Sequence, residues 1–246
     1  MYRLPWLPAE PDAPFPPVER ALREPDGLLA MGGDLHPGRL LNAYRHGIFP
    51  WFNPGEPVLW WSPDPRTVFH SAGHALPRRF RRSLRDSRWT VSADRDFATV
   101  LARCADAPRP GQQGTWIGAP MQAAYARLHR LGHAHSIEVR DGGRLVGGLY
   151  GVCIGRMFFG ESMFSAVPGG SKVALGALLR RMAQWDWPLL DAQVHNPHLA
   201  LLGATSMPRA DFVAQARRQS ELPGHGAGFG QAFGELPARD LAEPAP

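Results

Sequence analysis

Apolar side chains repeat at helical spacing in several separate stretches of this chain. Near residue 40 such a repeat follows a proline that suits a first helical turn and precedes Gly47, which suits a helix end. The same spacing predicts helices over 94–104 and from about residue 120 to 130. Further helices are predicted after Ser171, as a capping residue, after Asn196-Pro197, and over 211–218.

Between these helices the pattern changes to short apolar runs bounded by turn residues. Residues 136–140 and 144–150 form a predicted hairpin across an Asp-Gly-Gly turn, and a third strand covers 156–159. A buried strand follows at 189–194, where alternation puts Asp191 and Gln193 on one face. Polar groups on a buried strand are costly unless they are bonded or used, so this pair is a candidate site.

The order of elements is strand, helix, helix, three antiparallel strands, helix, strand, helix. This order resembles the acetyltransferase-like (GNAT) fold, in which a ligand enters where neighbouring strands splay apart. We therefore expect an α+β protein with a GNAT-like catalytic domain over 63–220 and a small N-terminal α/β lobe over 1–62. Residues 221–246, rich in Gly, Ala and Pro, are expected to form a loosely ordered tail.

Charge is distributed unevenly along the 246 residues. The net charge of +5 comes from residues 76–130, which carry 11 arginines against 4 acids. In a helix over 77–89, Phe80 and Leu84 would face inward and arginines would form an outer stripe of the kind that tracks a phosphate backbone. A basic run is usually only a solvated face, but acids are few here. The candidate RNA-binding residues are Arg78, Arg79, Arg81, Arg82 and Arg85.

Composition also excludes several classes of protein. Cys104 and Cys153 are the only cysteines and form no CxxC pair, so neither a disulfide framework nor a zinc site is indicated. The proline-broken N-terminus lacks a signal core, and no apolar run approaches the ~20 residues that span a bilayer. A cytoplasmic protein without membrane contact is expected, and the histidines lack a metal-site pattern.

Two further stretches carry candidate chemistry. An apolar strand runs into Gly160-Glu161-Ser162, which places a carboxylate and a hydroxyl at a strand end beside aromatic residues. Upstream, five large aromatic residues occur within the 13 residues 49–61, fixed by prolines and glycines. They are either the core of a small lobe or a wall on which a base can stack.

Seven runs, in order, identify a family resemblance. They are residues 22–35, 47–52, 60–66, 114–117, 131–138, 159–165 and 191–194, and they closely resemble leucyl/phenylalanyl-tRNA-protein transferase. The resemblance implies an enzyme that moves Leu or Phe from Leu-tRNA or Phe-tRNA to the N-terminal α-amine of proteins beginning with Arg or Lys. These proteins are then degraded by the N-end rule. It implies no metal and no coenzyme.

The resemblance also assigns residue roles. Gln193 would draw on the attacking amine, Asp191 would orient or polarise it, and Glu161 would bind the acceptor's N-terminal region by charge. Trp51 and Trp116 match the family positions at the 3′-adenosine and donor pocket. We expect Leu149, Phe158 and Phe164 to line the apolar donor pocket, with Ser162 beside them.

Two alternatives stay open on the sequence. The first is an acetyltransferase using acetyl-CoA, although 165–171 lacks the leading cation and glycine spacing of a pyrophosphate loop. The second is a non-catalytic RNA-binding module, which would leave Asp191 and Gln193 unexplained. Ser162 and Ser165 lie outside any G-x-S-x-G pattern, so we discount an acyl-enzyme.

Overall fold

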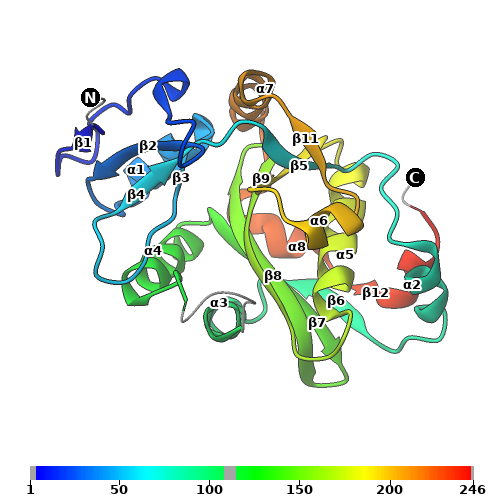
Figure 1. Cartoon of the computed structure of the whole chain (residues 1–246). Coiled ribbons are helices and arrows are strands. Elements are labelled where there is room, and N and C mark those ends of the chain that lie inside the picture. Colours follow the sequence, from blue (N-terminus) through cyan, green and yellow to red (C-terminus); the bar gives the residue numbers. More distant parts are fainter. Residues whose placement is uncertain (1–3, 108–114, 245–246) are drawn as a thin grey trace.

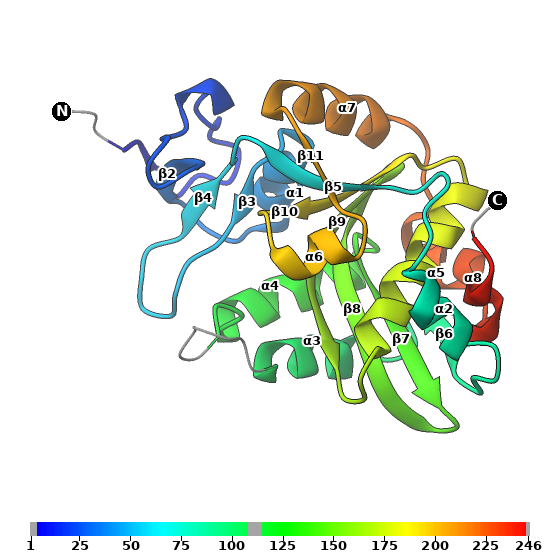
Figure 2. The same ribbon diagram turned by 45° about the vertical axis from the view of Figure 1, so that its right-hand side comes forward.

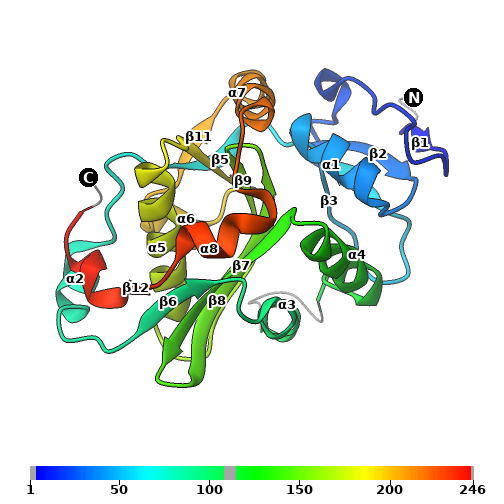
Figure 3. The same cartoon turned by 180° about the vertical axis from the view of Figure 1, so that it is seen from behind.

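The computed structural model describes residues 4–107 and 115–244 and contains two β-sheets. The N-terminal sheet has the strand order β1-β2-β4-β3, and the larger sheet has the order β11-β5-β10-β9-β8-β7-β6-β12. Figures 1 and 3 show the N-terminal sheet at one end of the molecule and helix α2 at the opposite end. The described part of the chain is thus a mixed α/β protein with a lobe beside a large sheet.

The elements of the N-terminal lobe are short. They are β1 (Trp6–Leu7), η1 (Val18–Arg20), β2 (Leu28–Gly32), α1 (Pro37–Arg45), β3 (Phe49–Pro50) and β4 (Leu59–Trp61). The predicted helix near residue 40 is confirmed: the ring of His36 accepts a hydrogen bond from the N–H of Gly38 at its start, and Leu40 and Tyr44 are fully buried. The aromatic run packs around Trp60, which is also fully buried.

The larger sheet and its helices make up the rest of the described chain. The strands are β5 (Arg66–His70), β6 (Thr90–Ala93), β7 (Ala134–Asp141), β8 (Arg144–Ile154), β9 (Met157–Ser165), β10 (Leu189–Gln193), β11 (Thr205–Met207) and β12 (Leu236–Pro237). The helices are α2 (Arg78–Ser83), α3 (Phe97–Asp106), α4 (Ala119–Arg130), α5 (Gly170–Gln184), α6 (Pro197–Leu201), α7 (Arg209–Glu221), η2 (Gly226–Gly228), α8 (Phe229–Phe233) and η3 (Ala238–Ala242).

The predicted hairpin and third strand form the antiparallel centre of the sheet. The third strand is longer than predicted, since β9 continues to Ser165 instead of ending at Phe159. It continues because β8 pairs with it along its whole length, across a bulge in which Tyr150 pairs with Ser162 and Gly151 with Gly160. The bulge leaves Glu161 without a pairing partner on β8, and it interrupts the alternation of side chains between the two faces of the sheet.

Helices cover both faces of the sheet. Helix α5 packs on one face of β7, β8 and β9, with α8 beside it, while α3 and α4 pack on the other face (Figures 2 and 3). The close approach of α5 needs glycine: a Cβ on Gly147 would lie 2.4 Å from the backbone of Gly170. The sheet is therefore buried on both faces between β7 and β9.

Helix α5 begins differently from the prediction. Ser171 does not cap it; the helix starts at Gly170, after Gly169 with φ of 93°. The hydroxyl of Ser165 accepts a hydrogen bond from the N–H of Ser171, so the end of β9 supplies the capping group.

The C-terminal segment differs from the expected loose tail. Phe229 and Phe233 of α8 are fully buried, and β12 pairs with β6. Residues 226–242 are ordered because these apolar side chains pack against the large sheet, which a composition of Gly, Ala and Pro does not reveal. Within the described ranges, the chain forms no helix with the length and apolar character needed to cross a bilayer.

Candidate active site

A cavity of about 430 Å³ opens where β9 and β10 separate. These two parallel strands pair at only two positions, Leu190 with Phe158 and Asp191 with Phe159. Beyond these positions the two strands no longer pair with each other and line the cavity instead. Helix α6, which lies in front of β9 and β10 in Figure 2, adds His198 and Leu199 to the lining. The lining residues are Phe69, Leu149, Tyr150, Phe158, Gly160, Glu161, Ser162, Met163, Leu175, Leu190, Asp191, Ala192, Gln193, Asn196, His198 and Leu199.

One part of the cavity is apolar. Leu149 and Phe158, both expected in a donor pocket, contribute to its wall together with Met163, Leu175 and Leu190. These side chains come from β8, β9, α5 and β10, so the wall is built from strands and a helix that pack against one another. An apolar wall of this kind suits a Leu or Phe side chain, with discrimination by shape only.

Phe164 is not in this wall, which corrects the expectation for it. Its side chain is buried in the core cluster on the face of the sheet covered by α3, while Met163 faces the cavity. Side chains alternate along a strand, and the bulge at Glu161 sets which of the two neighbours points inward. Ser162 lines the cavity as expected.

Glu161 lies at the polar end of the cavity and is held by three groups. Its Oε1 is 2.7 Å from the hydroxyl of Tyr44 and accepts a hydrogen bond of 2.8 Å from Nε2 of Gln193. Its Oε2 is 2.6 Å from the hydroxyl of Tyr125. The residue keeps some surface open to the cavity, but its carboxyl group is enclosed by protein, and this loss of hydration raises its pKa from 4.5 to about 7.

Asp191 is fully buried and paired. Both of its oxygens accept hydrogen bonds from the guanidinium of Arg66, at 2.8 and 2.7 Å. Arg66 also donates to the carbonyl of Gly47 and lies between the rings of Phe49 and Phe212. The bidentate pair joins β5 to β10 within the large sheet, and the bond from Arg66 to Gly47 connects this sheet to the N-terminal lobe.

Gln193 lies beside Asp191, but the regular alternation of side chains along a strand, on which the prediction was based, does not place it there. A register shift interrupts the pairing of β10 with β5 at this point, and Gln193 has a positive φ of 61°. The Oδ1 of Asp191 accepts a hydrogen bond of 2.9 Å from the backbone N–H of Gln193. Asp191 therefore orients the main chain of Gln193, and Glu161 orients its amide.

Three of these groups were not predicted as site residues. Tyr44 and Tyr125 lie in the helices predicted near residue 40 and from about residue 120 to 130, but helical spacing does not show that two hydroxyls meet Glu161. Arg66 ends the Trp-Trp-Ser-Pro-Asp-Pro-Arg run of the family resemblance, and that run was the one signal that could have indicated it.

The two tryptophans lie elsewhere. Trp51 and Trp116 pack, half-buried, against the core cluster that includes the N-terminal lobe, and the lining of this cavity in the described ranges includes neither. Trp51 lies 5.6 Å from the ring of Trp61, and its carbonyl accepts a hydrogen bond from the indole N–H of Trp61. Neither tryptophan is hydrogen-bonded to the group formed by Glu161, Tyr44, Tyr125 and Gln193.

The arginine run forms only a short helix, α2. Leu84 is buried and Phe80 half-buried, as predicted, and Arg78, Arg79, Arg82 and Arg85 are exposed. Arg81 differs, because its guanidinium donates to the carbonyls of Leu76 and Ala242 and so holds the C-terminal segment. Four of the five arginines therefore remain candidates for binding a phosphate backbone.

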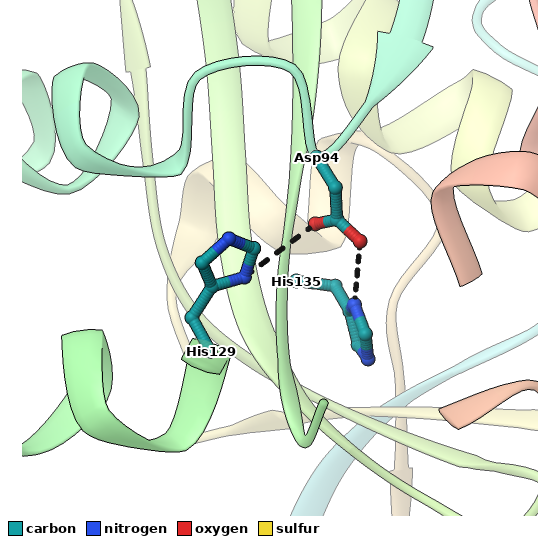
Figure 4. A group of neighbouring side chains, drawn as sticks. All are labelled: Asp94, His129 and His135. Atoms are coloured by element: carbon teal, nitrogen blue, oxygen red, sulfur yellow. Dashed lines mark hydrogen bonds and ion pairs between the residues drawn. The ribbon is translucent and has the colours of Figure 1, made fainter. Parts of the chain in front are cut away.

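Asp94, His129 and His135 form the other cluster of potential ligands in the described ranges (Figure 4). Each carboxylate oxygen of Asp94 already accepts a hydrogen bond, from Nδ1 of His135 at 2.7 Å and from the N–H of Ser136. Nδ1 of His129 is bonded to the carbonyl of Ala134 at 2.8 Å, so this nitrogen carries its proton and offers no lone pair. The donor set does not fit a metal ion in this arrangement.

Comparisons with known proteins agree with one another. Two family models match, described as leucyl/phenylalanyl-tRNA protein transferase over residues 68–217 and as its N-terminal domain over 33–64. A leucyl/phenylalanyl-tRNA–protein transferase of Xanthomonas euvesicatoria is 63% identical, over 94% of this chain and 92% of that protein. One of Xylella fastidiosa is 59% identical, over 98% of this chain and the whole of that protein.

Among solved structures, L-PGS from Bacillus licheniformis matches with a TM-score of 0.38 and 13% identity, over 55% of this chain and 49% of that chain. The sequence relatives cover nearly the whole chain, including Glu161, Asp191 and Gln193. The chain belongs to the leucyl/phenylalanyl-tRNA protein transferase family.

Proposed function

We propose that this enzyme transfers Leu or Phe from an aminoacyl-tRNA to the N-terminal α-amine of a protein that begins with Arg or Lys. The observation that carries the proposal is a cavity with an apolar wall at one part and the Glu161–Gln193 hydrogen bond at another. The apolar wall would take the donor side chain. The polar end would receive the acceptor amine, and the donor ester would lie between the two.

The reaction asks little acid–base chemistry of the protein. The ester of an aminoacyl-tRNA is already activated, so the enzyme gains most by holding the amine close to the carbonyl carbon. Nε2 of Gln193 donates to Glu161, which leaves the carbonyl oxygen of Gln193 to accept a hydrogen bond from the attacking amine. Gln193 thereby aligns the amine lone pair, and Asp191 and Arg66 hold the main chain of Gln193 in place.

The tRNA would contact the protein at two places. We propose that Trp51 and Trp116 stack on the 3′-adenosine and that the exposed arginines of α2 contact phosphates without reading sequence. In Figures 1 and 3, α2 and the N-terminal lobe lie at opposite ends of the molecule, so these are two separate contacts. Charged tRNA as donor implies that the enzyme acts in the cytoplasm.

The large sheet supports a GNAT-like assignment of the fold. Three antiparallel strands lead into α5, and a strand parallel to the third of them follows. The divergence of β9 and β10 is the place where ligands enter in that fold. We propose this assignment together with a catalytic domain over 63–220 and a lobe over 1–62.

The acetyl-CoA alternative finds no support at the start of α5. The N–H of Ser171 is already bonded to Ser165, and a Cβ on Gly169 would lie 2.7 Å from the ring of Phe80. A pyrophosphate at this helix start would have to displace both groups.

The test is a transfer assay with labelled leucine on tRNA and two peptides, one beginning with Arg and one beginning with Glu. We expect label in the Arg peptide alone, because the acceptor class is part of the proposal. Equal labelling of both peptides would contradict the acceptor class, and labelling of neither would contradict the function. In Met163→Trp the larger side chain should occupy the space beside the apolar wall of the cavity. This variant should lower incorporation at least tenfold.

A further inference from the structure

Four oxygen atoms from three residues, Tyr44, Tyr125 and Glu161, lie close together at the polar end of the cavity. The hydroxyls of Tyr44 and Tyr125 are 2.6 Å apart, and they lie 2.7 and 2.6 Å from the two oxygens of Glu161. All three separations are ordinary O–H···O hydrogen-bond lengths. Two oxygens this close without a proton between them would repel through their lone pairs, so each contact requires one proton.

The number of available protons depends on the charge of Glu161. With an ionised carboxylate, the two phenols supply two protons for three contacts, and one contact is left with facing lone pairs. A neutral carboxylic acid supplies the third proton. Glu161 then donates to Tyr125, Tyr125 donates to Tyr44, and Tyr44 donates to the other oxygen of Glu161, which closes a ring.

We propose that Glu161 is a neutral carboxylic acid in the resting protein and forms a closed ring of three hydrogen bonds with Tyr44 and Tyr125. The ring positions the amide of Gln193. Its members come from three elements far apart in the sequence: α1 of the N-terminal lobe, α4 and β9. Both tyrosines are fully buried, so no water layer separates the three groups.

The surroundings of the ring favour the neutral form. Among the described residues, the hydrogen-bond partners of Glu161 are two phenols and one amide, and none of these is a cation. The ring of Tyr150 on β8 faces Tyr125, and Asp191 on β10 adds negative charge. The guanidinium of Arg66 on β5 is bound through two hydrogen bonds to Asp191, and His198 of α6 lines the same cavity. Burial accordingly raises the pKa of Glu161.

Glu138 is a buried carboxyl with the opposite arrangement. It is fully buried, and its partners are the hydroxyls of Ser92 and Ser136 and the backbone N–H groups of Arg95 and Asp96. All four partners can donate a hydrogen bond to Glu138. An ionised carboxylate therefore has one proton for each of these four contacts and needs none of its own. Glu138 is therefore a matched control within the same sheet.

The ring has a consequence for transfer that rests on the proposed function. The oxygen of Glu161 that accepts from Tyr44 also accepts from Nε2 of Gln193, which turns the carbonyl oxygen of Gln193 toward the acceptor amine. Tyr44 and Tyr125 are then positioning residues that act through Glu161. This differs from the expectation that Glu161 binds a cationic acceptor by its charge.

The ring is tested by difference infrared spectroscopy of the full chain at neutral pH, comparing wild type with Glu161→Gln. We expect the carbonyl stretch of a protonated carboxylic acid in the wild type and its loss in this variant. Glu138→Gln should leave that band unchanged. Absence of the band from the wild type, or its persistence in Glu161→Gln, overturns the proposal. Circular dichroism confirms that each variant is folded.

The positioning role is tested separately by single-turnover transfer. Glu161→Gln should retain the rate within about threefold, because an amide can donate to Tyr125 and accept from Tyr44 and Gln193. Glu161→Ala, Tyr44→Phe and Tyr125→Phe should each lower the maximal single-turnover rate constant by roughly tenfold or more, with little change in the acceptor concentration that gives half of this rate. An inactive, folded Glu161→Gln overturns the positioning role and leaves the infrared result to decide the ring. A wild type without transfer activity contradicts the proposed function only.

Discussion

Arg66 and Asp191 form a buried ion pair directly behind the candidate site, and both side chains are almost completely inaccessible. Replacing Arg66 by Met keeps much of the packing between Phe49 and Phe212 but leaves the buried carboxylate of Asp191 without its cationic partner. We expect Arg66→Met to lower the free energy of unfolding by roughly 3–5 kcal/mol, measured by urea denaturation with tryptophan fluorescence. A surface pair provides the control: Arg95→Met removes an exposed partner of Glu235 and should cost less than about 1 kcal/mol. Equal losses in the two variants would show that the buried pair is not the cause.

Helix α2 is the element on which the proposed tRNA contact can be tested, because three exposed arginines and one structural arginine lie within its six residues. The triple replacement of Arg78, Arg79 and Arg82 by Gln should weaken binding to every tRNA. It should also flatten the salt dependence by roughly one unit of slope per lost phosphate contact, measured by filter binding at several salt concentrations. Arg81→Gln is the internal control: it removes the bonds to Leu76 and Ala242, so it should lower stability and leave the slope unchanged. An unchanged slope in the triple variant would exclude α2 as the contact.

At the scale of the whole molecule, the protonation of Glu161 contributes to the free energy of unfolding. Its pKa is about 7 in the folded protein and near 4.5 when exposed, so the folded state binds more protons between these values. This contribution is fully present below pH 4.5 and is lost as the pH rises through 7, by roughly 3 kcal/mol at most. Denaturation across this range should show a steeper decline for wild type than for Glu161→Gln. Parallel curves would mean that Glu161 ionises normally in the folded chain.

Most of the secondary structure could be predicted because it depends on local spacing. The helices near residues 40 and 120 and the hairpin around Asp141 follow from the periodicity of neighbouring residues. The length of β9 and the capping of α5 could not, since both depend on residues from another element: β8 pairs with β9, and Ser165 caps the helix. The ordered segment after residue 226 was missed for the same reason, because Phe229 and Phe233 gain stability only from the sheet they pack on.

The family could be identified from the sequence alone, through seven runs in order, and Glu161, Asp191 and Gln193 were already among the candidate residues. How these residues are arranged could be seen only in the folded protein. A bulge on β9 sends Met163 into the cavity in place of Phe164, and a positive φ at Gln193 replaces simple alternation. Three further residues lie at the site: Tyr44 from α1, Tyr125 from α4 and Arg66 from β5. Arg66 pairs with the carboxylate of Asp191, whereas the carboxyl of Glu161 is bonded to the two tyrosine hydroxyls and to no cation among the described residues. The protonation of a carboxyl group depends on the groups that surround it in space. The spacing of residues along the chain does not show which groups these are.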